Sequence, residues 1–413
     1  MKIQQLTALL WIVLITVSLQ SNGSVTTRKA YYASMQFMES PFSDFKGIVP
    51  LTIKEATQRN HYLFEYDSRD NLKRISFRLG NVLRAPNHTA NYFFHSSRID
   101  FEYSPGQEIR TFYDQFNQQI SIRGGVFREI YSLDKLGHRT MVRFEDKESR
   151  PVENNWNIAR YAWTLQTNGA VIEERYNLKG ELVPMRPDLF FYRVRFHFGY
   201  TGSLALMQQI DDMGNLVENQ TGVAQDRILY DKMGRWYGWA VLDKNHQLTE
   251  GNGPAVAQGI YPANAWGYES FSWHVDRHGK PLASKYGFWG SSTSFDSRGN
   301  MVKRTFLDSL QNPGPHLIAG YTHMRITWDK TGLLQLATEL LDGNYSPIEH
   351  RRTGYAYVRH AYDRKRRMVR TTFHDKTGQL INRKDNGVAY LHYHYQPDGS
   401  PTIIRYNKEG KEL

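Results

Sequence analysis

The chain has 413 residues, of which 14% are aromatic and 23% charged, with a formal net charge of +11 and no cysteine. The lack of cysteine excludes a disulfide framework and a lipoprotein anchor, so stability has to come from a core and from backbone hydrogen bonds. Tyrosine (26) and phenylalanine (21) dominate the aromatic residues. Such side chains suit a pleated, half-buried surface, and the composition therefore favours strands over helices.

The N-terminus carries the pattern of an export signal. Met1 and Lys2 form a short positive start, residues 6–19 are apolar, and Ser21 and Gly23 supply the small residues that signal peptidase prefers. We therefore expect residues 1–23 to be a signal peptide and the mature protein to be periplasmic or extracellular. The alternative is a chain anchored in the membrane by an uncleaved segment 6–19.

Removal of residues 1–23 leaves 51 basic against 41 acidic residues, a net charge of +10. A positive field of this kind favours anionic partners, such as acidic glycans or the headgroups of a membrane contacted peripherally. Export argues against a nucleic-acid partner. One basic run, residues 364–367, lies between two strand-like segments and is typical of a solvated turn.

Residues 24–60 fit no repeat and are predicted to form an irregular N-terminal segment or cap. From residue 61 to residue 413 a unit of about 33 residues recurs, in about ten copies. Each copy reads as strand, tight turn, strand, tight turn and a short link. The turns form two interleaved series, and one of them runs from Asp114 to Asn407, 293 residues in nine steps.

The residues of that first series are Asp114, Asp146, Asn177, Asp211, Asp243, Asp276, Asp308, Asp342, Asp375 and Asn407. The second series contains Asp134, Asp231, Asn264, Asp296, Asp329 and Asp363, with glycine three residues later at most of them. Asp at the first position of a type I turn accepts a hydrogen bond from the backbone N–H two residues on, and glycine at the fourth tolerates a positive φ. The pattern predicts antiparallel hairpins.

Within the strands the side chains alternate with period two, as in Ala389, Leu391, Tyr393 and Tyr395. One hairpin buries too little surface to fold alone, whereas stacked hairpins share a continuous core. We therefore predict an all-β protein of antiparallel hairpins stacked into a spiral sheet or a β-solenoid-like shell. The alternative architecture is a closed ring resembling a β-propeller.

The turns carry an aromatic residue before the aspartate, as in Tyr66-Asp67, Tyr113-Asp114, Tyr230-Asp231-Lys-Met-Gly234, Phe295-Asp296, Trp328-Asp329 and Tyr362-Asp363. In this the chain resembles the YD-repeat (Rhs-type) proteins over most of residues 60–413. The resemblance implies a spiral sheet of hairpins, which in that family can wrap into a hollow shell. The unit here is longer than that of the family.

Tryptophan is concentrated in the central repeats. Five of the nine lie within residues 236–289, interleaved with glycine: Trp236, Trp239, Trp266, Trp273 and Trp289. On the polar face of a sheet such rings form flat platforms for sugars. On the inner face they fill a wide core, and the high average burial of tryptophan favours that interpretation. These five residues are the candidate binding site.

Other patterns point less clearly to chemistry. Stacked turns place aspartates in rows, but each turn already uses its own carboxylate. His392 and His394 share a strand face without a third metal ligand nearby in the sequence. We find no catalytic motif and predict no catalytic residue, metal site or cofactor.

The sequence therefore favours an exported, non-catalytic repeat protein that binds an anionic or neutral glycan, or a protein partner. A second hypothesis is a shell or carrier component of a YD-repeat type system. The third is a polysaccharide-acting enzyme, which would require two carboxylates about 5–10 Å apart in a cleft.

Overall fold

The computed structural model describes residues 28–86, 94–396 and 400–413, so the predicted signal peptide and the alternative anchor lie outside the described residues. Over these ranges the chain forms 25 strands and one short helix. The elements of the N-terminal third are β1 (Lys29–Met35), β2 (Gly47–Pro50), α1 (Ile53–Ala56), β3 (Asn60–Tyr66), β4 (Leu72–Leu79), β5 (Val82–Leu83), β6 (Arg98–Ser104), β7 (Gln107–Tyr113), β8 (Arg128–Leu133) and β9 (Arg139–Glu145).

The central strands are β10 (Arg160–Leu165), β11 (Val171–Tyr176), β12 (Arg193–Phe198), β13 (Leu204–Gln209), β14 (Gln225–Tyr230), β15 (Trp236–Leu242), β16 (Gln258–Ile260), β17 (Phe271–Val275), β18 (Gly290–Phe295) and β19 (Met301–Leu307). The last are β20 (His323–Trp328), β21 (Gln335–Leu341), β22 (Tyr357–Tyr362), β23 (Met368–His374), β24 (Tyr390–Tyr395) and β25 (Pro401–Tyr406).

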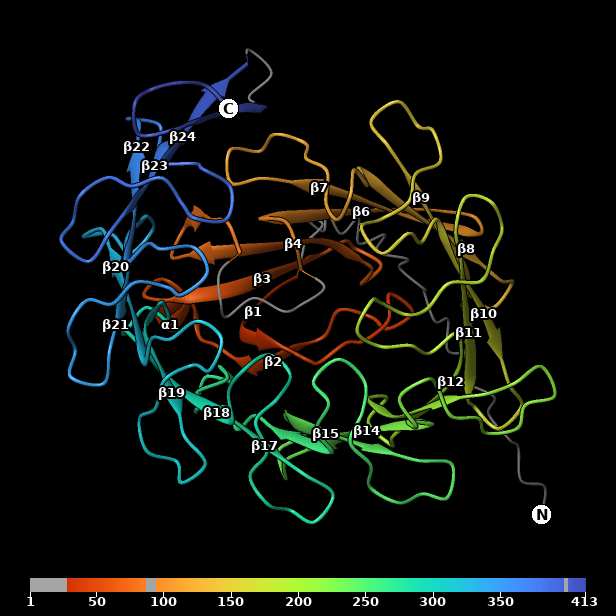
Figure 1. Cartoon of the computed structure of the whole chain (residues 1–413). Helices are drawn as coiled ribbons and strands as arrows, with labels where there is room; N and C mark the ends of the chain where they lie inside the picture. The colour runs from red at the N-terminus through yellow and green to blue at the C-terminus, as the bar shows by residue number, and fades with distance from the viewer. Residues whose placement is uncertain (1–27, 87–93, 397–399) are drawn as a thin grey trace, which may run out of the picture.

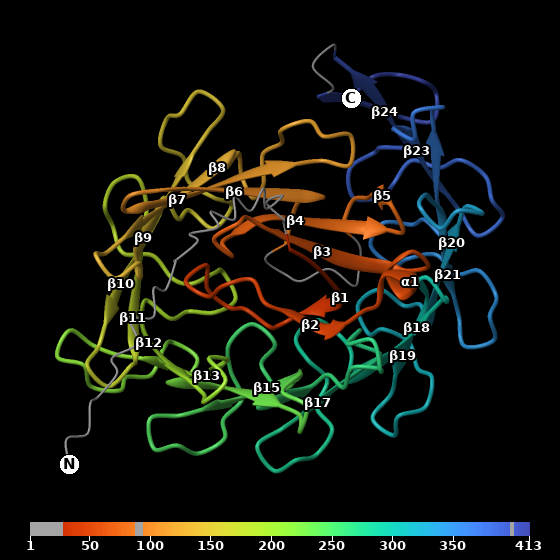
Figure 2. The ribbon, with the colours of Figure 1, turned by 180° about the vertical axis from the view of Figure 1, so that it is seen from behind.

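All the strands belong to one antiparallel sheet that follows the chain order. β3 pairs with β4, β4 with β5 and β6, and from β6 to β25 each strand pairs with the next. At the N-terminal edge β1 pairs with both β2 and β3. Figures 1 and 2 show the sheet winding around an interior, so the predicted all-β stack of antiparallel hairpins is confirmed.

The winding is a spiral and not a closed ring, so the propeller-like alternative is wrong. Its first strands meet the hairpin turns of a later part of the sheet. Backbone N–H of Asn60 donates to Arg298 O at 2.8 Å, and Nη1 of Arg84 donates to Asn300 Oδ1 at 2.8 Å and to Gly332 O at 3.2 Å. The first strands therefore contact turns of the later sheet and do not pair with its strands. The sheet can then continue past its first strands without closing into a ring.

The N-terminal segment was predicted to be irregular over residues 24–60, and the structure differs. Within its described part, β1, β2 and α1 are regular elements, and β1 and β2 lie inside the winding (Figure 1). The reason is that β1 pairs with both β2 and β3, and its later residues Ala33, Ser34 and Met35 are all buried. Between β1 and β2 the chain crosses the interior, and Phe42 and Phe45 contact the rings of Trp163 and Phe101 on the wall.

The turn chemistry predicted from the aspartate series is confirmed. In a typical turn the Asp276 Oδ1 accepts from the backbone N–H of His278 and of Lys280, each at 2.8 Å. The second of these bonds was not predicted and ties the carboxylate to the strand that follows. Where glycine is missing from the fourth position, the residue still adopts a positive φ, as at Arg366 (66°) in the predicted basic turn.

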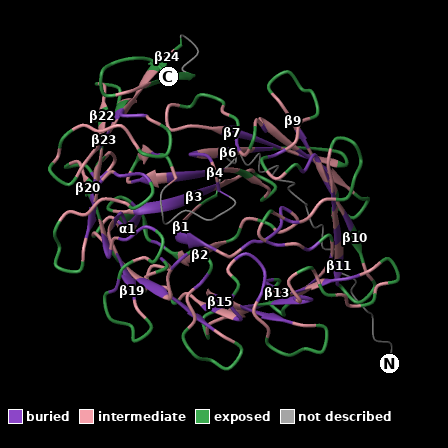
Figure 3. Cartoon of the chain, viewed as in Figure 1, coloured by how far each residue is buried: buried purple, intermediate pink, exposed green. Residues whose placement is uncertain are grey.

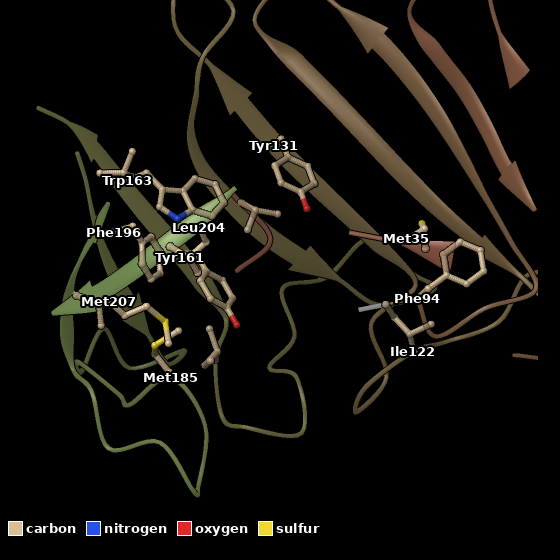
Figure 4. Close-up of a cluster of buried hydrophobic side chains, with 14 of the residues drawn as sticks. Met35, Phe94, Ile122, Tyr131, Tyr161, Trp163, Met185, Phe196, Leu204 and Met207 are labelled. Atoms are coloured by element: carbon tan, nitrogen blue, oxygen red, sulfur yellow. The ribbon is translucent and has the colours of Figure 1, made fainter. Parts of the chain in front are cut away.

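The inner face of the sheet is the hydrophobic core. Its largest buried cluster runs from the first strands through β15 and includes Met35 of the N-terminal segment. Figure 4 shows one part, with Tyr131 from β8, Tyr161 and Trp163 from β10, Phe196 from β12 and Met207 from β13. Burial is concentrated on this side, while the outward loops are exposed (Figure 3).

A buried ion pair on the wall is hydrogen-bonded to the segment that crosses the interior. Glu173 and Arg175, both fully buried on β11, form a salt bridge. The Glu173 carboxylate also accepts from Trp163 Nε1 at 2.8 Å and from the Ser40 hydroxyl. Because Arg175 in turn donates to Phe191 O at 2.9 Å, these charges are compensated by several hydrogen bonds.

We predict that Asp276→Ala lowers the free energy of unfolding by about 1–2 kcal/mol, because two hydrogen bonds to the carboxylate are lost. Asp276→Asn is the control and should lie close to wild type, since Asn264 fills the same role in its own turn. Urea denaturation followed by circular dichroism measures both. Equal loss in the two variants would contradict the role given to the side-chain oxygen.

We predict that Glu173→Ala costs about 3–5 kcal/mol, because it leaves the Arg175 guanidinium buried without its carboxylate. Glu174→Ala is the matched control, since Glu174 pairs with Arg193 where both side chains are partly solvated. Its effect should stay below about 1 kcal/mol. Thermal denaturation measures the stability of both variants. A Glu173→Ala protein as stable as the Glu174→Ala control would contradict the stabilising role of the buried ion pair.

Candidate functional site

A cavity of about 510 Å³ lies between the N-terminal segment and the wall formed by β14, β15 and the residues that follow β16. The N-terminal segment contributes Met35, Phe37 and Met38. The wall contributes Trp236 and Trp239, two of the predicted site residues, and the cavity has the size of sites that hold small molecules.

The two tryptophans differ in how much ring surface they leave open. Phe37 and Tyr261 both stack on the Trp236 ring, with centroid distances of 5.0 and 5.1 Å. Trp239 is half-buried and stacks on no other ring of the described chain. Trp239 therefore offers the more open aromatic face, whereas Trp236 is held between its neighbours.

A glycine makes room for this arrangement. Trp239 lies opposite Gly259 on the neighbouring strand β16. A Cβ at position 259 would come within 2.7 Å of both the Trp239 and the Tyr261 rings. The missing side chain lets both rings lie against the wall and keeps the space above them open.

The cavity gathers polar atoms that have no partner. Thirteen buried side-chain polar atoms of the described residues lack a hydrogen bond, and four of them belong to residues that line this cavity: Ser34 Oγ, Asp226 Oδ1, Trp236 Nε1 and Asn252 Nδ2. Asp226 and Asn252 are only 8% and 7% exposed. An unsatisfied buried polar group costs about 1–3 kcal/mol, so four at one place indicate a position for a polar ligand or for water.

The charged groups around the cavity are mostly paired. Arg186 forms ion pairs with Glu39 and, at 2.7 Å, with Asp188. Arg235 is held by Asp231 at 2.7 Å. Two cavity carboxyl groups, those of Asp226 and Glu269, form no ion pair or hydrogen bond with the described residues.

Desolvation raises the pKa of Asp226 to about 7, although Arg186 acts in the opposite direction. It likewise raises the pKa of Glu269 to about 7, against the field of Arg304. The Glu269 side chain faces the cavity space and remains accessible to water there, so Asp226 has the larger influence on stability.

The other three predicted tryptophans lie elsewhere. Trp266 packs beside Tyr268 and is covered by the guanidinium of Arg59 at 3.3 Å from the ring centroid. Trp273 is buried in a separate cluster with Val275 and Leu307, and Trp289 packs against that cluster. The structure therefore brings Trp236 and Trp239 together at one cavity and places Trp266, Trp273 and Trp289 outside it.

The turn aspartates and the two histidines of β24 make structural contacts. The turn aspartates accept hydrogen bonds from their own turns, as described for Asp276. His392 and His394 contact each other through their rings, and the described residues contain no group of three or more potential metal ligands. No helix within the described ranges is long and apolar enough to cross a membrane.

Sequence reasoning missed Ser34, Asp226, Asn252 and Glu269. For Asp226 a signal was present: it shares a strand face with Ile228 and Tyr230, so a carboxylate stands where the alternation expects an apolar residue. No such signal marked Asn252 or Glu269, because both lie in irregular segments outside the strands.

No protein-family model and no curated protein sequence matches the chain. Among solved structures it is similar to TcdB2-TccC3-TEV, with a TM-score of 0.33 and 11% identity over 88% of this chain. A Photorhabdus luminescens Tc holotoxin pore (TM-score 0.26, 10% identity, 87% of this chain and 19% of that one) and a porin-like protein from Bacteroides uniformis (0.23, 11%, 92% and 96%) are also similar. The chain spans about a fifth, 20%, of the length of the TcdB2-TccC3-TEV chain.

We predict that burial of Asp226 makes the fold less stable as pH rises. Its pKa is about 7 in the folded protein and about 3.9 when unfolded, so between these values the folded state binds the extra proton and stability falls with rising pH. Asp226→Asn removes this contribution, and the variant should gain on the order of 1–4 kcal/mol over wild type at pH 8.

The measurement is the difference in unfolding free energy between the variant and wild type at pH 4 to 8. A difference is needed because buried histidines with a lowered pKa, such as His61 and His274, change stability in the opposite sense. The exposed Asp212→Asn is the control and should show no trend. A constant difference for Asp226→Asn would contradict the burial of its charge.

Proposed function

We propose that this chain is an exported, non-catalytic binding protein that holds one small, elongated polar ligand, such as a short glycan segment, in the cavity behind its N-terminal segment. The observation that carries the proposal is the convergence of four unpartnered polar atoms on a cavity lined by Trp236 and Trp239. Aromatic faces with a few placed polar groups are the usual composition of a small-molecule site.

The arrangement of carboxyl groups supports binding over hydrolysis. Asp226 lies opposite Val241, and Trp239 opposite Gly259, while Glu269 bridges to Ala263 further along. From Val241 to Trp239 and from Gly259 to Ala263 the chain advances six residues. The last of these lie beyond the end of β16, so the rise is at most about 20 Å. Two glycosidase carboxylates flank a single scissile bond. Asp226 and Glu269 lie at different levels of the wall, and this arrangement suits separate groups of one ligand better.

The YD-type affiliation belongs to this proposal as well, and it is supported by the aromatic-aspartate turns along the spiral. In a shell or carrier role the cargo would be small, because the chain's own segment between β1 and β2 crosses the interior. A cavity of about 510 Å³ suits a small molecule and has no room for a folded protein.

We predict that Trp239→Ala weakens binding of a short oligosaccharide at least tenfold, because the open aromatic face is lost. Trp289→Ala is the matched control outside the cavity and should bind as wild type does. Isothermal titration calorimetry of the folded proteins against a panel of neutral, acidic and amino-substituted trisaccharides measures this. Equal weakening in both variants would contradict the cavity as the site.

A further inference from the structure

We propose that the ligand of this cavity is an elongated organic cation with a protonated amino group at each end, one held by Asp226 and the other by Glu269. This inference rests on the proposed function, because it names the chemical class of the molecule that the cavity binds. Two sources share that chemistry: an aliphatic polyamine and an oligomer of amino sugars.

The first argument is the position of the two carboxyl groups. As shown above, they belong to levels of the wall separated by six residues, at most about 20 Å. The levels between them are occupied by Trp239 and then Tyr261, both of which line the cavity. The cavity thus has an acid towards each end and an aromatic stretch in between.

The second argument is the lack of a partner for Asp226. Its Oδ1 is buried without a hydrogen bond, and the residue is only 8% exposed. A buried carboxylate without compensation is costly, and the group that compensates it best is a cation that also donates hydrogen bonds. An ammonium group supplies both.

The third argument is that the two guanidinium groups among the described residues lining the cavity are both engaged by carboxylates, so neither is available to an anionic ligand. Arg186 is engaged by Glu39 and Asp188, and Arg235 by Asp231. An acidic glycan would therefore enter a site with more carboxyl groups than cations. The positive charge of the whole chain lies elsewhere.

The fourth argument is the aromatic lining. Cations are attracted to the faces of Trp, Tyr and Phe rings by about 0.5–2 kcal/mol, most strongly where water is excluded. The half-buried ring of Trp239 lies between the two acids. It offers a surface for the methylene groups or sugar rings that connect the two amines.

Burial raises the pKa of Asp226 to about 7, whereas Glu269 is exposed to water. A bound ammonium group favours the ionised carboxylate, so binding releases a proton from Asp226 when the pH is below 7. The other titratable or charged groups that face these two acids are Glu39, Arg186, Asp188, Arg235, Tyr261 and Arg304. The arginines stay charged and Tyr261, whose pKa is raised by burial, stays neutral throughout this range.

The test is calorimetry of the purified full chain at pH 5 to 7 with four probes: spermidine, a linear glucosamine trimer, its N-acetylated form and a neutral glucose trimer. We expect the two amines to bind at least tenfold more tightly than the two neutral sugars. The better of the two amines identifies the source. For spermidine, which stays protonated in this range, affinity should fall about tenfold per pH unit well below 7, because one proton is displaced from Asp226.

The variant Asp226→Asn should abolish this fall, because the titrating group is gone. Glu269→Gln removes an exposed charge, so it should weaken spermidine binding about two- to fivefold and leave the slope unchanged. Asp212→Asn and Glu102→Gln, on exposed acids away from the cavity, are the matched controls and should keep both the wild-type affinity and the tenfold fall. Loss of a buried, unpartnered charge does not endanger folding of Asp226→Asn, and thermal denaturation verifies that each variant is folded.

If neutral sugars bind as well as the amines, or if amine binding shows no pH dependence, the cation inference is wrong while the binding function stands. If no probe binds to folded wild-type protein, both are wrong. If amines bind but Asp226→Asn keeps the wild-type pH slope, or Glu269→Gln binds spermidine as wild type does, the two acids do not hold the amines and the inference is overturned.

Discussion

An open, curled sheet has to bury its inner face, and in this protein the chain's own N-terminal segment does so. The residues between β1 and β2 cross the interior and are tied to the wall on several sides. Gln36 bonds to Ser203 at 2.6 Å, Ser40 to Glu173, and the carbonyl of Phe42 accepts from Arg139 at 2.8 Å. Without this segment the aromatic residues of β6 to β15 would face water, and the sheet would have no reason to curve around them.

The same segment creates the cavity. Phe37 stacks on Trp236, and Glu39 pairs with Arg186, so the segment closes one side of the space that the wall leaves open. Because Gly259 has no side chain, the Trp239 and Tyr261 rings pack over the backbone there and line the space. Two features with structural roles thus leave a volume whose lining contains more polar atoms than it can satisfy.

Sequence reasoning captured what local chemistry determines. The aspartate turns, the hairpins and the all-β spiral follow from spacing alone, because each turn is complete within about five residues. It failed where contacts join distant segments: residues 24–60 match no repeat, and nothing in their sequence shows that Ser40 meets Glu173. The tryptophan cluster illustrates both outcomes. Five residues look equivalent in sequence, but pairing with Gly259 opens Trp239 to the cavity, whereas the Arg59 guanidinium covers Trp266.

Two buried acids, Glu173 and Asp226, show the difference between a polar group that stabilises the fold and one that is left without a partner. At Glu173 a buried acid is compensated by Arg175, Trp163 and Ser40, and the result stabilises the fold. Asp226 is also buried, at 8% exposure, but its Oδ1 has no hydrogen bond, so the folded state bears the cost of the uncompensated acid. An apolar residue that matches Ile228 would be more stable at this position. A destabilising acid beside the half-buried Trp239 ring suits binding, since a ligand supplies the missing partner.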